Sequence, residues 1–307
     1  MRDHHVTFVV ESNVGPALYV FGGTNAWQTQ YDDIQRAKIS PDGTILAFEP
    51  IGTLPEARAG HCGVLVGKTA IFVGGVLGNG HPGIGGSTVR VPINDDGTIG
   101  TASKGPDLPD AVMHATCDVH GGYLYVVGGR GTRGGSIAQV VRARVHDDGT
   151  LDAFESLTPL SPDRSHHASF VRGEYLYVLG GLTGNPAGTN SDHSDVIRAK
   201  FEADGTLGAW QPAGNFDTPL SVSAAQLFAD RVYVFGGYPG GSAYTDVVRR
   251  GTIGEDGSMV FEKLDAKLSL ARAHVHQTPV WKTFIYSVGG HNDVDESIGT
   301  VDIGSFQ

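Results

Sequence analysis

Tyr175-Leu176-Tyr177-Val178-Leu179-Gly180-Gly181 is the stretch of sequence that decides the fold. It is rich in aromatic and β-branched residues, which predicts a short buried strand, and it ends at a glycine doublet where a Cβ would clash in a sharp turn. The same pattern occurs five more times, at residues 18–23, 71–75, 124–129, 232–237 and 285–290. The first glycines of successive doublets are 52, 54, 52, 56 and 53 residues apart. Six copies with so regular a period predict one supersecondary unit repeated along the chain.

Each repeat is predicted to contain four strands, of which the glycine-doublet strand is the second. A tight turn after the third strand carries Asp-Gly in five copies, at residues 42–43, 96–97, 148–149, 204–205 and 256–257. Asp-Gly between two strands is a strong hairpin signal, because this turn requires a positive φ. The sixth repeat is shorter, since only one further strand, around 297–303, follows Gly289-Gly290. We therefore expect three strands there, with an exposed edge of the kind that natural proteins usually cover.

This arrangement resembles the kelch-repeat family, and the resemblance extends over nearly the whole chain. It implies an all-β fold, a six-bladed kelch-type β-propeller in which residues 1–307 form a single domain. The last blade is expected to be three-stranded.

Composition and charge exclude several classes of partner. The formal net charge of −11 argues against nucleic acid, whose binding needs a basic surface. No apolar stretch approaches the length of a membrane span, so no membrane partner is expected. The N-terminus lacks the apolar segment of a signal peptide, which predicts a cytoplasmic protein, or a secreted one if a signal peptide has been removed. Cys62 and Cys117 are too few for a disulfide framework, and we expect buried free thiols.

The beginnings of the first strands carry the most distinctive polar residues. In an up-and-down blade they emerge on the same face as the loops between the second and third strands. Four repeats begin with arginine, where the other two have Val112 and Val222: Arg2, Arg58, Arg164 and Arg272. Two residues further on, the second and fifth repeats have Gly60 and Ala224, and the other four have histidine: His4, His114, His166 and His274. The next position adds His5, His61 and His167.

Two interpretations of these residues stay open. The general kelch consensus has arginine and histidine here, where both pack blades together. The arginine position also resembles the one that, in kelch adaptor proteins, lines the ligand-binding mouth of the channel and binds acidic peptides. A second arginine set recurs on the third strands, and we expect it to be structural: Arg36, Arg90, Arg142, Arg198 and Arg249.

The loops between the second and third strands differ between repeats, and variable loops on a rigid scaffold commonly carry function. They add Trp27, Arg130, His193, Tyr238 and His291 to the candidate ligand-binding residues. His291, Asp293 and Asp295 alternate, so an extended chain could point them one way as metal ligands. A solvated acidic loop is the alternative interpretation of this segment.

Two functions follow from these candidates. The first is a binding propeller that captures an anionic ligand, such as an acidic peptide, carboxylate or phosphate, on the loop face, with no cofactor. The second is an isomerase or lyase on the same face, working by histidine acid–base or metal chemistry. The first predicts anion binding that strengthens as histidines gain charge between about pH 8 and 5. The exposed edge of the sixth repeat predicts a weak homodimer.

Overall fold

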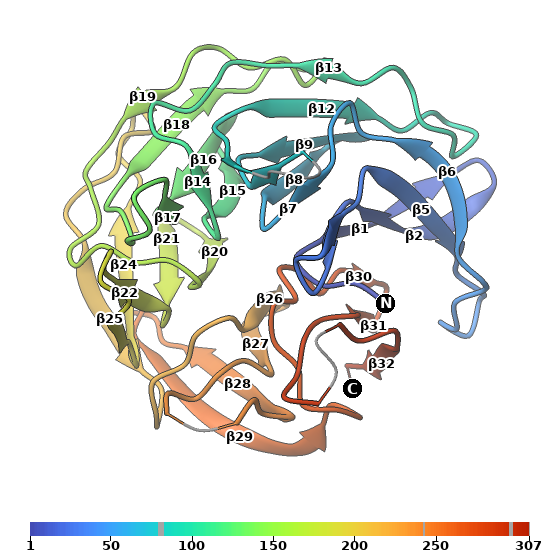
Figure 1. The fold of residues 1–307 in the computed structure, drawn as a ribbon. Coiled ribbons are helices and arrows are strands. Elements are labelled where there is room, and N and C mark those ends of the chain that lie inside the picture. Colours follow the sequence, from blue (N-terminus) through green and yellow to red (C-terminus); the bar gives the residue numbers. More distant parts are fainter. Residues whose placement is uncertain (79–82, 242, 295–296, 307) are drawn as a thin grey trace.

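The computed structural model describes residues 1–78, 83–241, 243–294 and 297–306. These residues form strands, turns and irregular segments without any helix, so the predicted all-β class is confirmed. It follows that no helix in this part of the chain could cross a membrane. Figure 1 shows the sheets arranged in a ring around a central axis, and the last sheet of the chain closes the ring beside β1 (Val6–Ser12).

Antiparallel sheets built from sequence neighbours make up the ring. The first contains β1, β2 (Gly15–Phe21), β5 (Asp33–Lys38) and β6 (Glu49–Thr53). The second contains β8 (Cys62–Val66), β9 (Thr69–Val73), β12 (Thr88–Pro92) and β13 (Ser103–Lys104). The third contains β15 (Thr116–His120), β16 (Tyr123–Val127), β18 (Val140–Arg144) and β19 (Glu155–Ser156).

The fourth and fifth repeats share one eight-stranded sheet, because their outer strands β25 and β29 pair in parallel. Its strands are β20 (Ala168–Arg172), β21 (Tyr175–Leu179), β24 (Asp195–Lys200), β25 (Gln211–Asn215), β26 (Ala224–Phe228), β27 (Arg231–Phe235), β28 (Val247–Ile253) and β29 (Met259–Lys267). The last sheet has the three strands predicted for it: β30 (Val280–Trp281), β31 (Phe284–Val288) and β32 (Val301–Ser305).

Short strands form small sheets in the loops after the glycine doublets, or where the chain enters a repeat. They are β3 (Thr24–Asn25), β4 (Thr29–Gln30), β7 (Arg58–Ala59), β10 (Val76–Leu77), β11 (Gly83–Ile84), β14 (Val112–Met113), β17 (Arg130–Gly131), β22 (Leu182–Gly184) and β23 (Asn190–Asp192).

The glycine doublets end their strands for the predicted reason. Gly180 and Gly181 have φ of 54° and 89°, and a Cβ on Gly181 would lie 2.7 Å from the carbonyl oxygen of Ser165. A side chain there would push the incoming segment of the same repeat away. The Asp-Gly turns also have the positive φ they require, as at Gly43 with φ of 86°.

A closed ring of backbone hydrogen bonds surrounds the axis. In each bond the N–H of one repeat donates to the carbonyl oxygen of the repeat before it, over 2.8–3.1 Å. The ring runs through His4, Gly60, His114, His166, Val222 and His274, and returns to His4. All six have φ between 52° and 63°. The position of Val222 corrects the sequence alignment, which placed Ala224 beside the histidines and is wrong by two residues in the fifth repeat.

The prediction of free cysteine thiols is also wrong. Cys62 on β8 and Cys117 on β15 form a disulfide, with Cα atoms 5.6 Å apart, instead of remaining free thiols. The inner strands of neighbouring repeats lie side by side around the axis, and this places two cysteines 55 residues apart in sequence within bonding reach.

Candidate functional site

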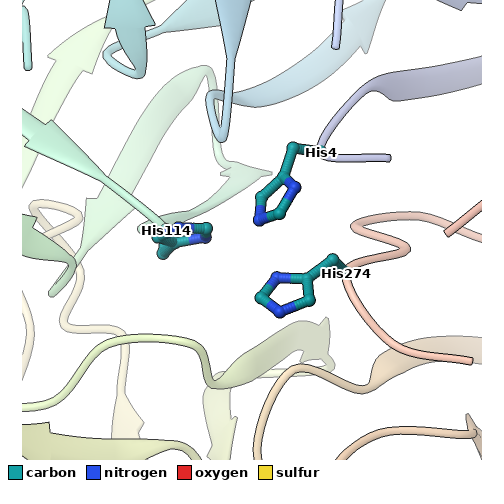
Figure 2. Close-up of side chains that lie close together, drawn as sticks. All are labelled: His4, His114 and His274. Carbon is teal, nitrogen blue, oxygen red and sulfur yellow. The ribbon is translucent and has the colours of Figure 1, made fainter. Parts of the chain in front are cut away.

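Three histidines of the backbone ring meet on the axis. Figure 2 shows the imidazoles of His4, His114 and His274 coming from separate segments and facing a common space. The ring centroid of His4 lies 4.1 Å from that of His274 and 5.0 Å from that of His114. One ligand atom from each side chain lies within 4.8 Å of the other two. The left-handed backbone conformation, rare outside glycine, aims these side chains at one another.

Gly60 of the second repeat lies between His4 and His114 in the backbone ring. A Cβ on Gly60 would already be 3.5 Å from Cε1 of His114 and 3.6 Å from Cη2 of Trp27. A larger side chain at this position would therefore press on the rings of His114 and Trp27. The gap in the histidine pattern is thus part of the geometry of the site.

Each of the three imidazoles retains a buried nitrogen without a hydrogen-bond partner among the described residues. These nitrogens are Nε2 of His4, Nδ1 of His114 and Nδ1 of His274. The other nitrogen of His4, Nδ1, donates to Oδ1 of Asp3. Asp3 is fully buried, and its second oxygen accepts a hydrogen bond from Ser297 over 2.5 Å. Buried polar atoms are normally satisfied, so these three nitrogens are available to a ligand. The histidines between the repeats also have unpartnered nitrogens among the described residues, namely Nδ1 of His5 and His167 and both nitrogens of His61, so it is the convergence of the three axial rings that distinguishes this site.

Burial keeps the axial imidazoles neutral. Desolvation lowers the pKa of His166 to about 3 and that of His276 to about 4. It also holds the pKa values of His4, His114 and His274 well below their usual range. The expected switch of charge between pH 5 and 8 is therefore wrong for these histidines, because a group protonates near its pKa.

A cavity of about 230 Å³ lies against the histidines, and its lining includes His114, His166, His274 and His276. Asp118 on β15 also lines it, and Ser169 donates a hydrogen bond to Oδ2 of this carboxyl group. Desolvation raises the pKa of Asp118 to about 6. Sequence reasoning missed Asp118, although the period-two rule places it on the same face of its strand as Thr116, which also lines the cavity. It missed Asp3 as well.

Three of the four arginines predicted to line the channel mouth lie inside the protein, and Arg2 is partly exposed. Arg58, Arg164 and Arg272 are at most 1% exposed. Arg58 donates to the carbonyl oxygens of Gly74 and Ser87 over 2.7 and 2.9 Å. The same position in the other repeats bonds similarly: Arg164 to Gly180 and Asp195, Arg272 to Gly289 and Thr300, and Arg2 to Gly22 and Asp33. The guanidinium groups bridge the loops of their repeats and do not form an open anion site.

His5, His61 and His167 are buried between neighbouring repeats and turned away from the three axial histidines. Their Cε1 atoms approach the glycine doublets of the preceding repeat, as His167 does at Gly128. Nε2 of His167 also lies 3.0 Å from Oγ1 of Thr116. These histidines match the packing interpretation of the pattern.

The loop residues divide into those near the axis and those away from it. Trp27 packs over His4 with ring centroids 4.5 Å apart, and His291 lies 5.6 Å from His274. Tyr238 is one step further out, since its ring contacts Tyr244 and not the axial histidines. Two further loop candidates lie away from the axial histidines. Arg130 is partly exposed on β17, and Nε2 of His193 lies 2.9 Å from Oγ1 of Thr183.

Of the acidic segment predicted as a weak metal site, the structure describes His291 and Asp293. Oδ2 of Asp293 accepts a hydrogen bond from the backbone N–H of Tyr244 over 2.9 Å. Asp295 lies outside the described residues. Among the residues that are described, the group able to hold a metal is the histidine triad and does not include His291 or Asp293.

Comparison with known proteins supports the fold and leaves the activity open. No family model matches the chain. A stretch of 135 residues, 43% of the chain, is 24% identical to the Leucine-zipper-like transcriptional regulator 1 homolog of Drosophila melanogaster. This match spans 14% of that protein's length, so the chain covers about a seventh of its relative. The solved structure of YjhT is similar with a TM-score of 0.75 and 11% identity, over 100% of this chain and 95% of that one. The all-β ring is thus a propeller-like fold.

Proposed function

We propose that residues 1–307 form a six-bladed kelch-type β-propeller that binds a small polar molecule in its axial cavity and acts as an isomerase or lyase. The six sequence repeats and the backbone ring through one residue of each repeat support the six-bladed architecture. The three-stranded last sheet fits a final blade that has three strands. Similarity to YjhT supports the propeller and says nothing of the reaction.

One observation carries the enzymatic proposal: Asp118 and several imidazoles line the same cavity. A cavity with a few converging polar groups of perturbed pKa is a typical active-site arrangement. Asp118, whose pKa is raised to about 6, can accept a proton and return it, while His166 and His276 stay neutral and can hydrogen-bond a substrate. The carboxyl group can thus remove a proton from a substrate carbon or hydroxyl group and return it elsewhere, as an isomerase or lyase requires.

Capture of an anionic ligand on the loop face remains the second candidate, with Arg130 in place of the arginines that bridge the loops of their repeats. Arg130 is partly exposed there, and its positive charge contributes to the lowered pKa of His166. An acidic peptide, a carboxylate or a phosphate would bind beside Arg130. An Arg130→Ala variant that loses binding of the ligand while Asp118→Asn retains it would favour this candidate.

The disulfide bears on the cellular location. A disulfide persists in oxidising compartments and is rare in the cytosol. Of the two locations that the sequence leaves open, the Cys62–Cys117 bond supports the secreted one.

The experiment that tests the enzymatic proposal follows proton exchange by NMR in D₂O over a panel of sugars and hydroxy acids. Interconversion or deuterium incorporation is expected for at least one compound and should be lost in Asp118→Asn. Ala225→Leu, which fills part of the cavity, should weaken binding of the same compound. Asp147→Asn is the matched control, because Asp147 is exposed. A compound that is converted or bound equally by Asp118→Asn and Ala225→Leu would contradict the proposal.

A further inference from the structure

We infer that His4, His114 and His274 form a binding site for one divalent transition-metal ion, for which Zn²⁺ is the reference case. This inference goes beyond the proposed reaction and stands without it, because it rests on the three side chains alone. Their ligand atoms lie within 4.8 Å of one another. Figure 2 shows the rings facing one space. Zinc bound by imidazole at about 2.0–2.1 Å in tetrahedral geometry places nitrogens roughly 3.4 Å apart. The ligand atoms therefore have to approach one another by at most about 1.4 Å to hold zinc.

The unpartnered nitrogens are the second, independent observation. His4 and His114 are 2% and 3% exposed, yet each has one buried nitrogen without a partner among the described residues. His274 has one as well. A buried nitrogen without a partner destabilises the fold, since its desolvation is not compensated. A cation bound through these nitrogens would compensate that desolvation.

Asp3 provides the outer support that metal-binding histidines usually have. Nδ1 of His4 donates to Asp3, and this assignment leaves Nε2 as the nitrogen with a free lone pair. A carboxylate behind a ligand imidazole fixes its orientation and raises its basicity. Ser297 donates in turn to the other oxygen of Asp3, so the support is itself held in place.

The backbone fixes the ligands before the metal arrives. His4 donates its N–H to the carbonyl oxygen of His274 over 3.1 Å, and Gly60 connects His4 to His114 through two further bonds of the ring. All three histidines have φ of 54–55°, a sparsely populated conformation that typically persists where surrounding structure holds it, often at functional sites. Trp27 covers His4 from the loop side.

The donor set indicates the class of metal. Neutral imidazoles suit Zn²⁺, Co²⁺, Ni²⁺ and Cu²⁺, whereas Mg²⁺ and Ca²⁺ prefer oxygen ligands. Among the described residues no fourth histidine, cysteine or carboxylate joins the group. Three protein ligands with one open position are typical of zinc sites that bind water or substrate, and structural sites normally have four.

The test is metal binding by the whole chain after its metal has been removed with a chelator. We expect one Zn²⁺ per chain by titration calorimetry and elemental analysis, and a Co²⁺ visible spectrum of tetrahedral type. X-ray absorption of the zinc-loaded wild-type protein should show three imidazole nitrogens. His4→Ala, His114→Ala and His274→Ala should each weaken Zn²⁺ binding more than 100-fold. Asp3→Asn should weaken it about 10–100-fold with one ion still bound.

His146→Ala is the control, because this exposed histidine should leave both affinity and stoichiometry unchanged. If an alanine variant does not fold, His114→Gln and the wild-type absorption spectrum still decide the question. No stoichiometric zinc in the wild type, fewer than three imidazole scatterers, or unchanged affinity in folded His114→Gln would overturn the inference. If no metal binds at the three histidines, the Asp118→Asn experiment still tests the proposed reaction.

Discussion

The backbone N–H of His4 donates to the carbonyl oxygen of His274 over 3.1 Å, and this bond joins the first repeat to the sixth at the axis. Gly290 reinforces the junction, since its N–H donates to the carbonyl oxygen of Arg2 over 3.0 Å. The ring therefore closes through the inner strands, even though the last sheet has only three strands. The same junction brings His4 and His274 together, so closure of the ring also assembles the axial site.

Arg164→Ala should destabilise the fold strongly. The side chain is fully buried, and it donates to the carbonyl oxygen of Gly180 over 3.0 Å and to Asp195 over 3.1 Å. Its removal leaves the buried carbonyl of Gly180 without this donor and breaks the pair with Asp195, whose side chain is 36% exposed, so we expect the free energy of unfolding to fall by roughly 1–3 kcal/mol. Urea denaturation at neutral pH measures this change.

Arg172→Ala is the matched control in the same repeat. Arg172 pairs with Asp230 over 3.0 Å, and that carboxylate is 80% exposed, so its loss should cost about 0–1 kcal/mol. Equal small effects of the two substitutions would show that Arg164 is not structural and would return it to the candidate anion site.

The sequence predicted the strands and turns well, because the glycine doublets and Asp-Gly pairs have a local physical cause. The alignment of the fifth repeat failed because Leu220-Ser221-Val222 has neither the arginine nor the histidine that marks this position elsewhere. Recurrence alone could not say whether an arginine faces the channel or the interior. The left-handed backbone of the histidines was also missed, although Gly60 in their midst was a signal for positive φ.

Asp118→Asn should stabilise the protein at pH 8. Burial raises the pKa of this carboxyl group from 3.8 to about 6, so the folded state binds its proton more tightly than the unfolded state does. The stability that the protein has while Asp118 is protonated is fully present below about pH 4 and is lost as the pH rises through 6. The neutral amide avoids this penalty, which is about 3 kcal/mol for a shift of this size.

The gain in Asp118→Asn should shrink as the pH falls from 8 toward 4, and urea denaturation across this range measures it. Exposed Asp147→Asn is the control. A gain that does not change with pH would mean that Asp118 is not perturbed by burial.

The histidines between the repeats should make the protein sensitive to acid. Desolvation lowers the pKa of His167 from 6.5 to about 3, so below pH 6.5 the unfolded state binds more protons than the folded state. Stability is therefore full above pH 6.5 and falls as the pH decreases, by about 1.4 kcal/mol per pH unit for each such histidine. His167→Gln should flatten this slope by about that amount between pH 6 and 5. His146→Gln, at an exposed position, should leave the slope as it is in the wild type.

Reduction of the Cys62–Cys117 bond should lower stability without changing the strand content. The bond joins β8 to β15 across a separation of 55 residues, and a crosslink of this length restricts the unfolded chain by roughly 2–4 kcal/mol. Thiol titration of the denatured protein should find no free thiol before reduction and two after it. Two free thiols in the protein as purified under oxidising conditions would contradict the bond.

The outer strand of the last sheet should support weak self-association. β32 ends that sheet among the described residues, and Ile303 on it is 41% exposed. A strand edge with unpaired backbone groups can pair with a second chain. We expect the mass from analytical ultracentrifugation to rise with concentration for the wild type and to stay monomeric for Ile303→Lys. Val260→Lys is the matched control, because Val260 is 73% exposed on β29, which is paired on both sides. A wild-type protein that stays monomeric at the highest concentration reached would show that this edge does not pair with a second chain.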